Sequence, residues 1–137
     1  MFERILLAVD GSEHSKKAIE LVKQLAPQLD SEVIVVHVRE KVATRGGVYS
    51  AYGEEEESSA ERQVLAELEE ARARVRAVEA SALHGQVGHK IVETAAAVDA
   101  DVIAMGTRGL GEVAGMFLGS VAHRVLHLAE CPVLIAR

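Results

Sequence analysis

Short, predominantly apolar segments alternate along this chain with longer segments in which apolar residues recur every three or four positions. Residues 5–9, 33–38, 101–105 and 133–136 are of the short kind and are built from Val, Ile, Leu, Ala and Met with few polar interruptions. Such segments are typical of strands that are buried on both faces of a parallel sheet. A fifth and weaker strand is predicted at about residues 79–84.

The longer segments predict amphipathic helices, because their apolar residues fall on one face at helical spacing. The first helix begins after Ser12, a residue type that caps helix N-termini, and ends near Asp30. A second helix is predicted from residue 60 to residue 78, and shorter ones follow Gly88 and Ser120. Residues 40–59 contain glycines and a run of glutamates and show no regular period at their start, so we expect a long irregular segment there.

Strands that alternate with helices through right-handed crossovers form an open parallel sheet with helices on both faces. The sequence therefore predicts a doubly wound α/β fold. In such sheets, ligands bind at the carboxyl ends of the strands, where the order of the chain across the sheet reverses. Asp10 and Gly106 each directly follow a predicted strand and are candidates for that position.

Apolar residues make up 49% of the chain and aromatic residues only 3%, so we expect one domain over residues 1–137 with an aliphatic core. The formal net charge of −6 argues against general nucleic-acid binding, which needs surplus Lys and Arg. The single cysteine, Cys131, excludes an intramolecular disulfide. Since no signal peptide or membrane-length apolar run is recognisable, we expect a cytoplasmic protein without a membrane partner.

Five glycines lie between residues 106 and 119, directly after a predicted strand and before a predicted helix. Backbone amides in a glycine-rich loop, together with those at the start of a helix, form a cradle for phosphate. Arg108 adds positive charge to this loop. The alternative interpretation is a flexible loop and helix start that bind no ligand.

The spacing of Gly106, Gly109 and the pair Gly119-Ser120 resembles the phosphate-binding signature of the universal stress protein family, in its nucleotide-binding branch. Residues 5–12, which end in Val-Asp-Gly-Ser, resemble the first strand and turn of that family, and residues 131–134 resemble its closing strand. The resemblance thus covers essentially the whole chain. It implies a Rossmann-like five-stranded sheet in the order 3-2-1-4-5, ATP between the ends of the first and fourth strands, and a homodimer formed through the last strand.

By matching positions, the resemblance also implies which residues contact an adenine nucleotide. Val38 would pack on adenine, and Ser120 would bond phosphate, whereas Ala122 replaces a hydroxyl residue of many relatives. Asp10 would hold ribose hydroxyls or a Mg²⁺ ion on the phosphates, the alternative being an Asx-turn at Gly11. The residues carried over are Ala8, Val9, Asp10, Gly11, Ser12, Val38, Met105, Gly106, Arg108, Gly109, Gly119, Ser120 and Val121.

Motifs of other nucleotide-binding and catalytic classes are absent from the sequence. There is no Gly-x-x-x-x-Gly-Lys-Ser/Thr loop, and no Gly-x-Gly-x-x-Gly follows the first strand. His123 and His127 have metal-pair spacing but lack the glutamate of a zinc-protease helix, and Ser12 with His14 and Asp10 is better explained as a helix cap than as a triad.

We therefore expect a stress or regulatory protein that binds ATP, or else AMP or cyclic AMP, and is not a dedicated enzyme. In this hypothesis, nucleotide occupancy orders the glycine-rich loop and acts as a conformational signal. A slow Mg-dependent ATPase and a nucleotide-free dimeric interaction module remain the alternatives.

Overall fold

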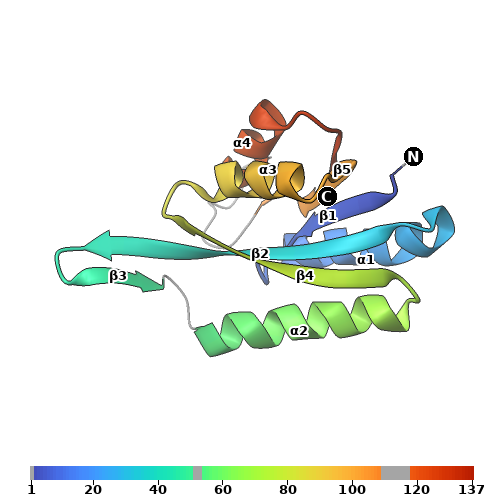
Figure 1. Cartoon of the computed structure of the whole chain (residues 1–137), viewed down its shortest axis with the longest axis horizontal. Helices are drawn as coiled ribbons and strands as arrows, with labels where there is room; N and C mark the ends of the chain where they lie inside the picture. Colours follow the sequence, from blue (N-terminus) through green and yellow to red (C-terminus); the bar gives the residue numbers. More distant parts are fainter. Residues whose placement is uncertain (1, 51–53, 109–117) are drawn as a thin grey trace.

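The computed structural model describes residues 2–50, 54–108 and 118–137, which form a mixed α/β structure with a central sheet (Figure 1). Strands and helices alternate along most of the chain, so the Rossmann-like fold class is confirmed. In chain order, the elements are β1 (Arg4–Ala8), α1 (Glu13–Leu29), β2 (Glu32–Thr44), β3 (Gly47–Ser50), α2 (Glu54–Glu70), β4 (Arg74–Leu83), α3 (Val87–Ala97), β5 (Val102–Gly106), α4 (Ser120–Leu128) and β6 (Val133–Ala136).

The parallel part of the sheet has β1 at its centre. β1 pairs with β2 on one side and with β5 on the other, β2 pairs with β4, and β5 pairs with β6. These five strands lie in the order β4-β2-β1-β5-β6, which corresponds to the order 3-2-1-4-5 implied by the family resemblance. Within the described residues, a sixth strand, β3, pairs antiparallel with the far end of β2, so the expectation of five strands is corrected to six.

The hairpin of β2 and β3 replaces part of the irregular segment that we predicted for residues 40–59. β2 continues to Thr44, and the chain reverses at Arg45 and Gly46. Gly47, the first residue of β3, has a φ of 132°, a backbone conformation that favours glycine. Val42 then lies opposite Tyr49, a pairing of two residue types that favour strands. The sequence prediction failed because this stability comes from pairing across the turn rather than from a periodic pattern.

The second predicted helix is also corrected, because α2 spans Glu54–Glu70 whereas residues 75 and 78 lie in β4. The helix is followed by Arg72 in the left-handed conformation, with a φ of 66°, which turns the chain back. β4 then pairs with β2 over ten residues, from Arg74 opposite Glu32 to Leu83 opposite Lys41. Val75 and Val78 match a helical spacing, but pairing with a long neighbouring strand decides their conformation.

Side chains alternate between two hydrophobic clusters, one on each face of the sheet. Leu7 and Val35 point to the face covered by α1 and α2, whereas Leu6, Ile34 and Ile103 point to the face covered by α3 and α4. Figure 1 shows α2 on the opposite side of the sheet from α3 and α4. These strand residues are completely buried, which explains why the strands are apolar on both faces.

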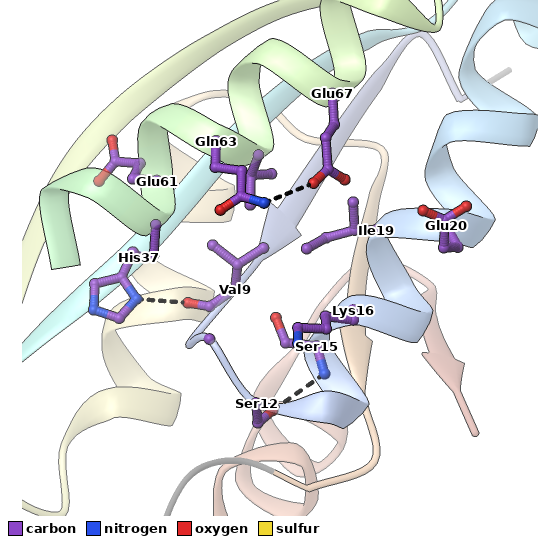
Figure 2. Close-up of a pocket in the computed structure, with 13 residues that line it drawn as sticks. Val9, Ser12, Ser15, Lys16, Ile19, Glu20, His37, Glu61, Gln63 and Glu67 are labelled. Atoms are coloured by element: carbon purple, nitrogen blue, oxygen red, sulfur yellow. Dashed lines mark hydrogen bonds between the residues drawn. The ribbon is translucent and has the colours of Figure 1, made fainter. Parts of the chain in front are cut away.

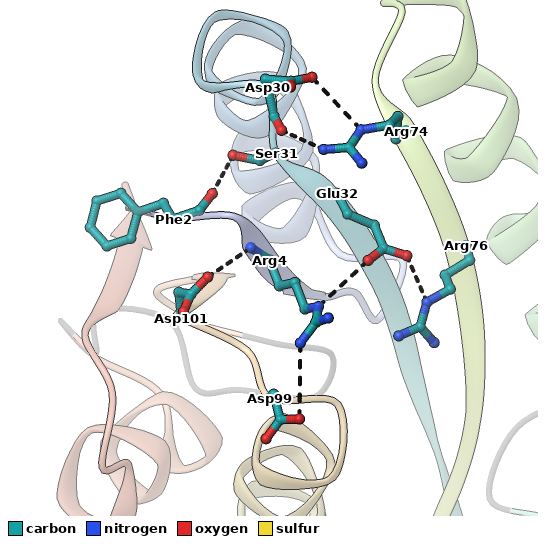
Figure 3. A network of polar contacts seen from close by, with 9 residues as sticks. All are labelled: Phe2, Arg4, Asp30, Ser31, Glu32, Arg74, Arg76, Asp99 and Asp101. Atoms are coloured by element: carbon teal, nitrogen blue, oxygen red, sulfur yellow. Dashed lines mark hydrogen bonds and ion pairs between the residues drawn. The ribbon is translucent and has the colours of Figure 1, made fainter.

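Ion pairs close the edge of the sheet at which the parallel strands begin (Figure 3). Arg76 Nε donates to Glu32 Oε1 at 2.8 Å, and Arg4 Nε lies 3.8 Å from Glu32 Oε2. The backbone N–H of Arg4 donates to Asp101 Oδ2 at 2.9 Å. Since these charges are partly exposed, each pair contributes little stability. They join β1, β2 and β4 to the turn before β5, at the edge away from the predicted ligand site.

Candidate functional site

The chain order across the sheet reverses between β1 and β5, at the edge where both strands end. The two strands are adjacent, with Leu7 opposite Ala104. After β1 the chain enters α1 on one face, and after β5 it continues to α4 on the other. The structure therefore brings Asp10 and Gly106 to the same point of the sheet edge, which is where ligands bind in folds of this class.

The turn between β1 and α1 is held by hydrogen bonds among its own residues. Asp10 Oδ1 accepts from the N–H of Ser12 at 2.9 Å, and Gly11 has a φ of 83°. Ser12 caps α1 as predicted, because its Oγ accepts from the N–H of Ser15 at 3.1 Å. Ser15 Oγ in turn accepts from the N–H of Asp10 at 3.2 Å. The Asx-turn at Asp10 is thus present, and a ligand role for this carboxylate stays a prediction.

Gly106 lies against the first turn of α1. A Cβ atom at this position would be 2.5 Å from both the carbonyl carbon and the carbonyl oxygen of His14. Glycine is therefore required here for helix packing, independently of the ligand contact that the family resemblance implies for Gly106. The close approach brings the start of α1 directly to the end of β5.

The two described ends of the glycine-rich loop meet each other. The N–H of Gly119 donates to the carbonyl of Thr107 at 2.7 Å, and Ser12 Oγ lies 3.4 Å from the carbonyl oxygen of Arg108, to which it donates. The predicted contact residue Gly109 lies outside the described residues, as does the rest of the loop to residue 117. The loop thus starts and ends beside the first turn of α1.

α4 begins directly after this junction. Gly119 is buried and is the N-cap in extended conformation, whereas Ser120 is exposed and Val121 half-buried. The first backbone N–H groups of a helix have no partner within the helix and carry partial positive charge. Ala122 is 1% exposed and packs in the core, so the missing hydroxyl at this position would have been buried.

Val38 lies on β2 two residues beyond Val36, the last residue of β2 that pairs with β1. The N–H of Val9 donates to the carbonyl of Val36 at 3.0 Å. Because backbone groups alternate along a strand, the N–H and C=O of Val38 point to the same side, past the end of β1. Its side chain is buried in the cluster on the face of α3 and α4, as are those of Ala8 and Met105.

A cavity of about 440 Å³ lies on the other face, between α1 and α2 (Figure 2). Val9, Ile19 and Val64 give it an apolar lining, and His37 lies beside Val9. His37 Nδ1 is 2.9 Å from the carbonyl oxygen of Val9, and since a carbonyl only accepts, this nitrogen carries the proton. Three residues that the family resemblance assigned to nucleotide contact, Val9, Gly11 and Ser12, line this cavity. The lining residues of α1 and α2 carry no motif that could have indicated it from the sequence.

The positions of Ser12 and His14, and of the side chains that could bind a metal, concern the alternatives of a catalytic triad and a metal site. His14 Nδ1 contacts Thr107 Oγ1 at 3.2 Å, while Ser12 Oγ serves the helix cap, so the described geometry does not pair Ser12 with His14 as a triad requires. Among residues 2–50, 54–108 and 118–137, no three His, Cys, Asp or Glu side chains are grouped as metal ligands would be. In the same part of the chain, no helix combines the length and apolarity needed to cross a bilayer.

Comparison with known proteins identifies relatives over the whole chain. The sequence profile of the universal stress protein family matches residues 1–137. The universal stress protein in QAH/OAS sulfhydrylase 3'region of Thermus aquaticus is 38% identical over 143 residues, with all of both chains covered. Universal stress protein YxiE of Bacillus subtilis is 34% identical over 148 residues, again with 100% of both chains covered.

Solved structures agree with the fold. Hypothetical protein MJ0577 superposes with a TM-score of 0.81 at 24% identity, covering 99% of this chain and 96% of that chain. A universal stress protein in complex with cAMP gives 0.73 at 24% identity, covering 98% and 96%. The Archaeoglobus fulgidus protein in complex with dAMP gives 0.72 at 21% identity over the full length of both chains. From its sequence relatives and its profile match, this chain belongs to the universal stress protein family.

Proposed function

We propose that this protein binds an adenine nucleotide, with ATP as the first candidate, where β1 and β5 end, and that occupancy of the site is a regulatory signal. The observation that carries the proposal is the junction of Thr107 with Gly119, which sets the start of α4 beside the β1–α1 turn. Two proteins of similar fold were solved with cAMP and dAMP, which supports an adenine nucleotide.

The start of α4 suits the phosphates. Its first backbone N–H groups point out of the helix, and the helix macrodipole favours an anion there. Ser120 is exposed, and in the proposal its hydroxyl donates a hydrogen bond to a phosphate oxygen. Arg108 is half-buried at the other end of the loop and supplies a cation. In the proposal, the backbone of Gly109 completes this cradle.

The end of β1 suits the base and the ribose. The backbone N–H and C=O of Val38 extend past β1 on the side of β2 that faces the site, and together they match one donor and one acceptor on the edge of adenine. The carboxylate of Asp10 is half-buried in the turn next to them. We propose that it accepts from ribose hydroxyls or holds Mg²⁺ bound to the phosphates.

We propose binding rather than dedicated catalysis. Ser12, the nearest candidate nucleophile, donates to Arg108 and accepts from Ser15, and the side chain of His14 bonds to Thr107. These contacts hold the turn and the loop instead of activating a hydroxyl. Incubation of the purified protein with Mg-ATP distinguishes binding from slow hydrolysis by whether ADP accumulates.

We also propose a homodimer through β6. Within the described residues, β6 pairs with β5 on one side, and Val133, Leu134 and Ile135 are only partly buried. An apolar edge strand with free backbone groups favours pairing with a second copy. Pro132 precedes the strand and so does not remove an amide from its later residues.

Calorimetric titration with Mg-ATP tests the nucleotide site. We expect Gly109→Val to weaken binding at least tenfold, about 1.4 kcal/mol, because a branched side chain blocks backbone approach to phosphate. Gly46→Val, in the hairpin away from the site, is the matched control. If Gly109→Val stays folded and binds as tightly as the unmodified protein, the phosphate assignment is wrong. Mass spectrometry of nucleotide released on denaturation then identifies the preferred ligand.

A further inference from the structure

One side-chain pair, His14 and Thr107, connects the first turn of α1 with the residue that follows β5. Thr107 Oγ1 and His14 Nδ1 are 3.2 Å apart, although the two residues are separated by 93 positions in the sequence. Thr107 is 6% exposed, so its hydroxyl is shielded from water. The proposed nucleotide contacts do not include either residue.

Thr107 also holds two other elements through its backbone. Its N–H donates to the carbonyl of Ala136 in β6 at 3.1 Å, and its carbonyl accepts from the N–H of Gly119 at 2.7 Å. Gly106, the residue before Thr107, has no side chain, and the backbone of α1 at His14 therefore packs directly against it. Thr107 is therefore the point at which α1, the start of α4 and the last strand are linked.

We propose that the hydrogen bond between His14 and Thr107 is a latch that positions the nucleotide site, and that both are positioning residues. The inference rests on the proposed function. Asp10 and the first amides of α4 belong to segments far apart in the sequence. A ligand that touches both requires their relative position to be fixed to within a fraction of an ångström. The bond between His14 and Thr107 links the segment that follows Asp10 to the segment that precedes α4. The second link, between Ser12 and Arg108, is longer at 3.4 Å.

A purely structural role would have different consequences. If the bond only satisfies a buried hydroxyl, its loss lowers stability and leaves nucleotide affinity unchanged. If it positions the site, its loss weakens binding in a folded protein, and the two residues act as one unit. Double-mutant cycles separate these cases, because residues that act through one bond are not additive.

Mg-ATP titration of variants measures the effect on binding. We expect Thr107→Val, which keeps the shape but removes the hydroxyl, and His14→Ala each to weaken affinity about three- to tenfold, the range for one hydrogen bond. The double variant should be little weaker than either single one. Thr107→Ser, which restores the hydroxyl, should bind within about twofold of the unmodified protein. His89→Ala, an exposed histidine on α3, is the matched control.

Amide hydrogen exchange of Gly119 in the nucleotide-free protein tests the latch independently of binding. We expect Thr107→Val and His14→Ala to accelerate exchange of this amide severalfold, since the carbonyl that accepts from it is no longer held, and His89→Ala to leave it unchanged. Affinity losses that multiply in the double variant, or unchanged Gly119 exchange in both single variants, would overturn the latch. If the unmodified protein binds no Mg-ATP, the proposed function fails and the positioning role fails with it, and Gly119 exchange then decides only whether the bond between His14 and Thr107 holds the start of α4.

Discussion

Replacing Gly106 by alanine tests how closely the start of α1 packs on the end of β5. The added Cβ would meet the carbonyl carbon and oxygen of His14 at 2.5 Å and the His14 Cβ at 2.9 Å. The first two are backbone atoms, which cannot rotate away as a flexible side chain can. The first turn of α1 must therefore move by about 0.9 Å to restore an ordinary contact of 3.4 Å.

The expected cost follows from overpacking a site with no free volume. Such substitutions cost about 1–3 kcal/mol, and the lower freedom of alanine in the unfolded chain offsets about 0.5 kcal/mol of this. With an unfolding entropy near 2.1 cal/mol/K per residue, each 1 kcal/mol lowers the melting temperature of a chain of this length by about 3.5 °C. We therefore expect Gly106→Ala to melt about 2–9 °C below the unmodified protein.

Thermal unfolding followed by circular dichroism measures this difference. Gly46→Ala is the matched control, because the nearest atom to its added Cβ, at 3.1 Å, is the hydroxyl of the exposed Tyr49 side chain. That side chain can move, so the control should melt within about 2 °C of the unmodified protein. Mg-ATP affinity should fall in Gly106→Ala as well, because the shift separates the turn from the loop. Equal melting temperatures for the two variants would refute the packing explanation.

Four further outcomes are expected. Asp10→Ala should weaken Mg-ATP binding and cost only about 1 kcal/mol of stability, since it removes one turn contact, whereas a large stability loss with unchanged affinity would favour a purely structural turn. Ser12→Ala should cost about 0.5–2 kcal/mol in a denaturant titration through loss of the helix cap, and an unchanged midpoint would contradict the capping geometry. Leu134→Lys or Ile135→Lys, whichever faces the partner, should shift the light-scattering mass toward the monomer, and a monomeric unmodified protein would rule out the dimer. Burial raises the pKa of the Cys131 thiol, so at pH 8 this residue should carry less thiolate and react with iodoacetamide more slowly than a cysteine in the unfolded chain, and a faster reaction would contradict its burial.

Local patterns in the sequence were sufficient for the fold class. The apolar runs at residues 5–9 and 133–136 correspond to β1 (Arg4–Ala8) and β6 (Val133–Ala136), because strands covered on both faces need apolar residues at every position. Ser12 was predicted to cap α1 and does so, since a cap bond involves residues only three positions apart. Features that depend on neighbours in sequence are therefore readable from the sequence.

The errors occurred where pairing between distant residues decides conformation. Residues 75 and 78 continue a helical spacing, yet they lie in β4 because β2 offers a partner along ten residues. Thr44 and Tyr49 belong to a hairpin that no periodic pattern indicates. Strand pairing stabilises such segments through cross-strand contacts, and these override local preference.

The sequence by itself determined the alternation of strands and helices, the helix cap at Ser12 and the glycine-rich loop as the place to look for a ligand. Only the tertiary structure decided that Gly106 is needed for contact with α1 and that Thr107 bonds to His14 across 93 positions. It also placed the cavity between α1 and α2. The physical reason is that these features are contacts between segments far apart in the chain, and such contacts exist only once the sheet has assembled.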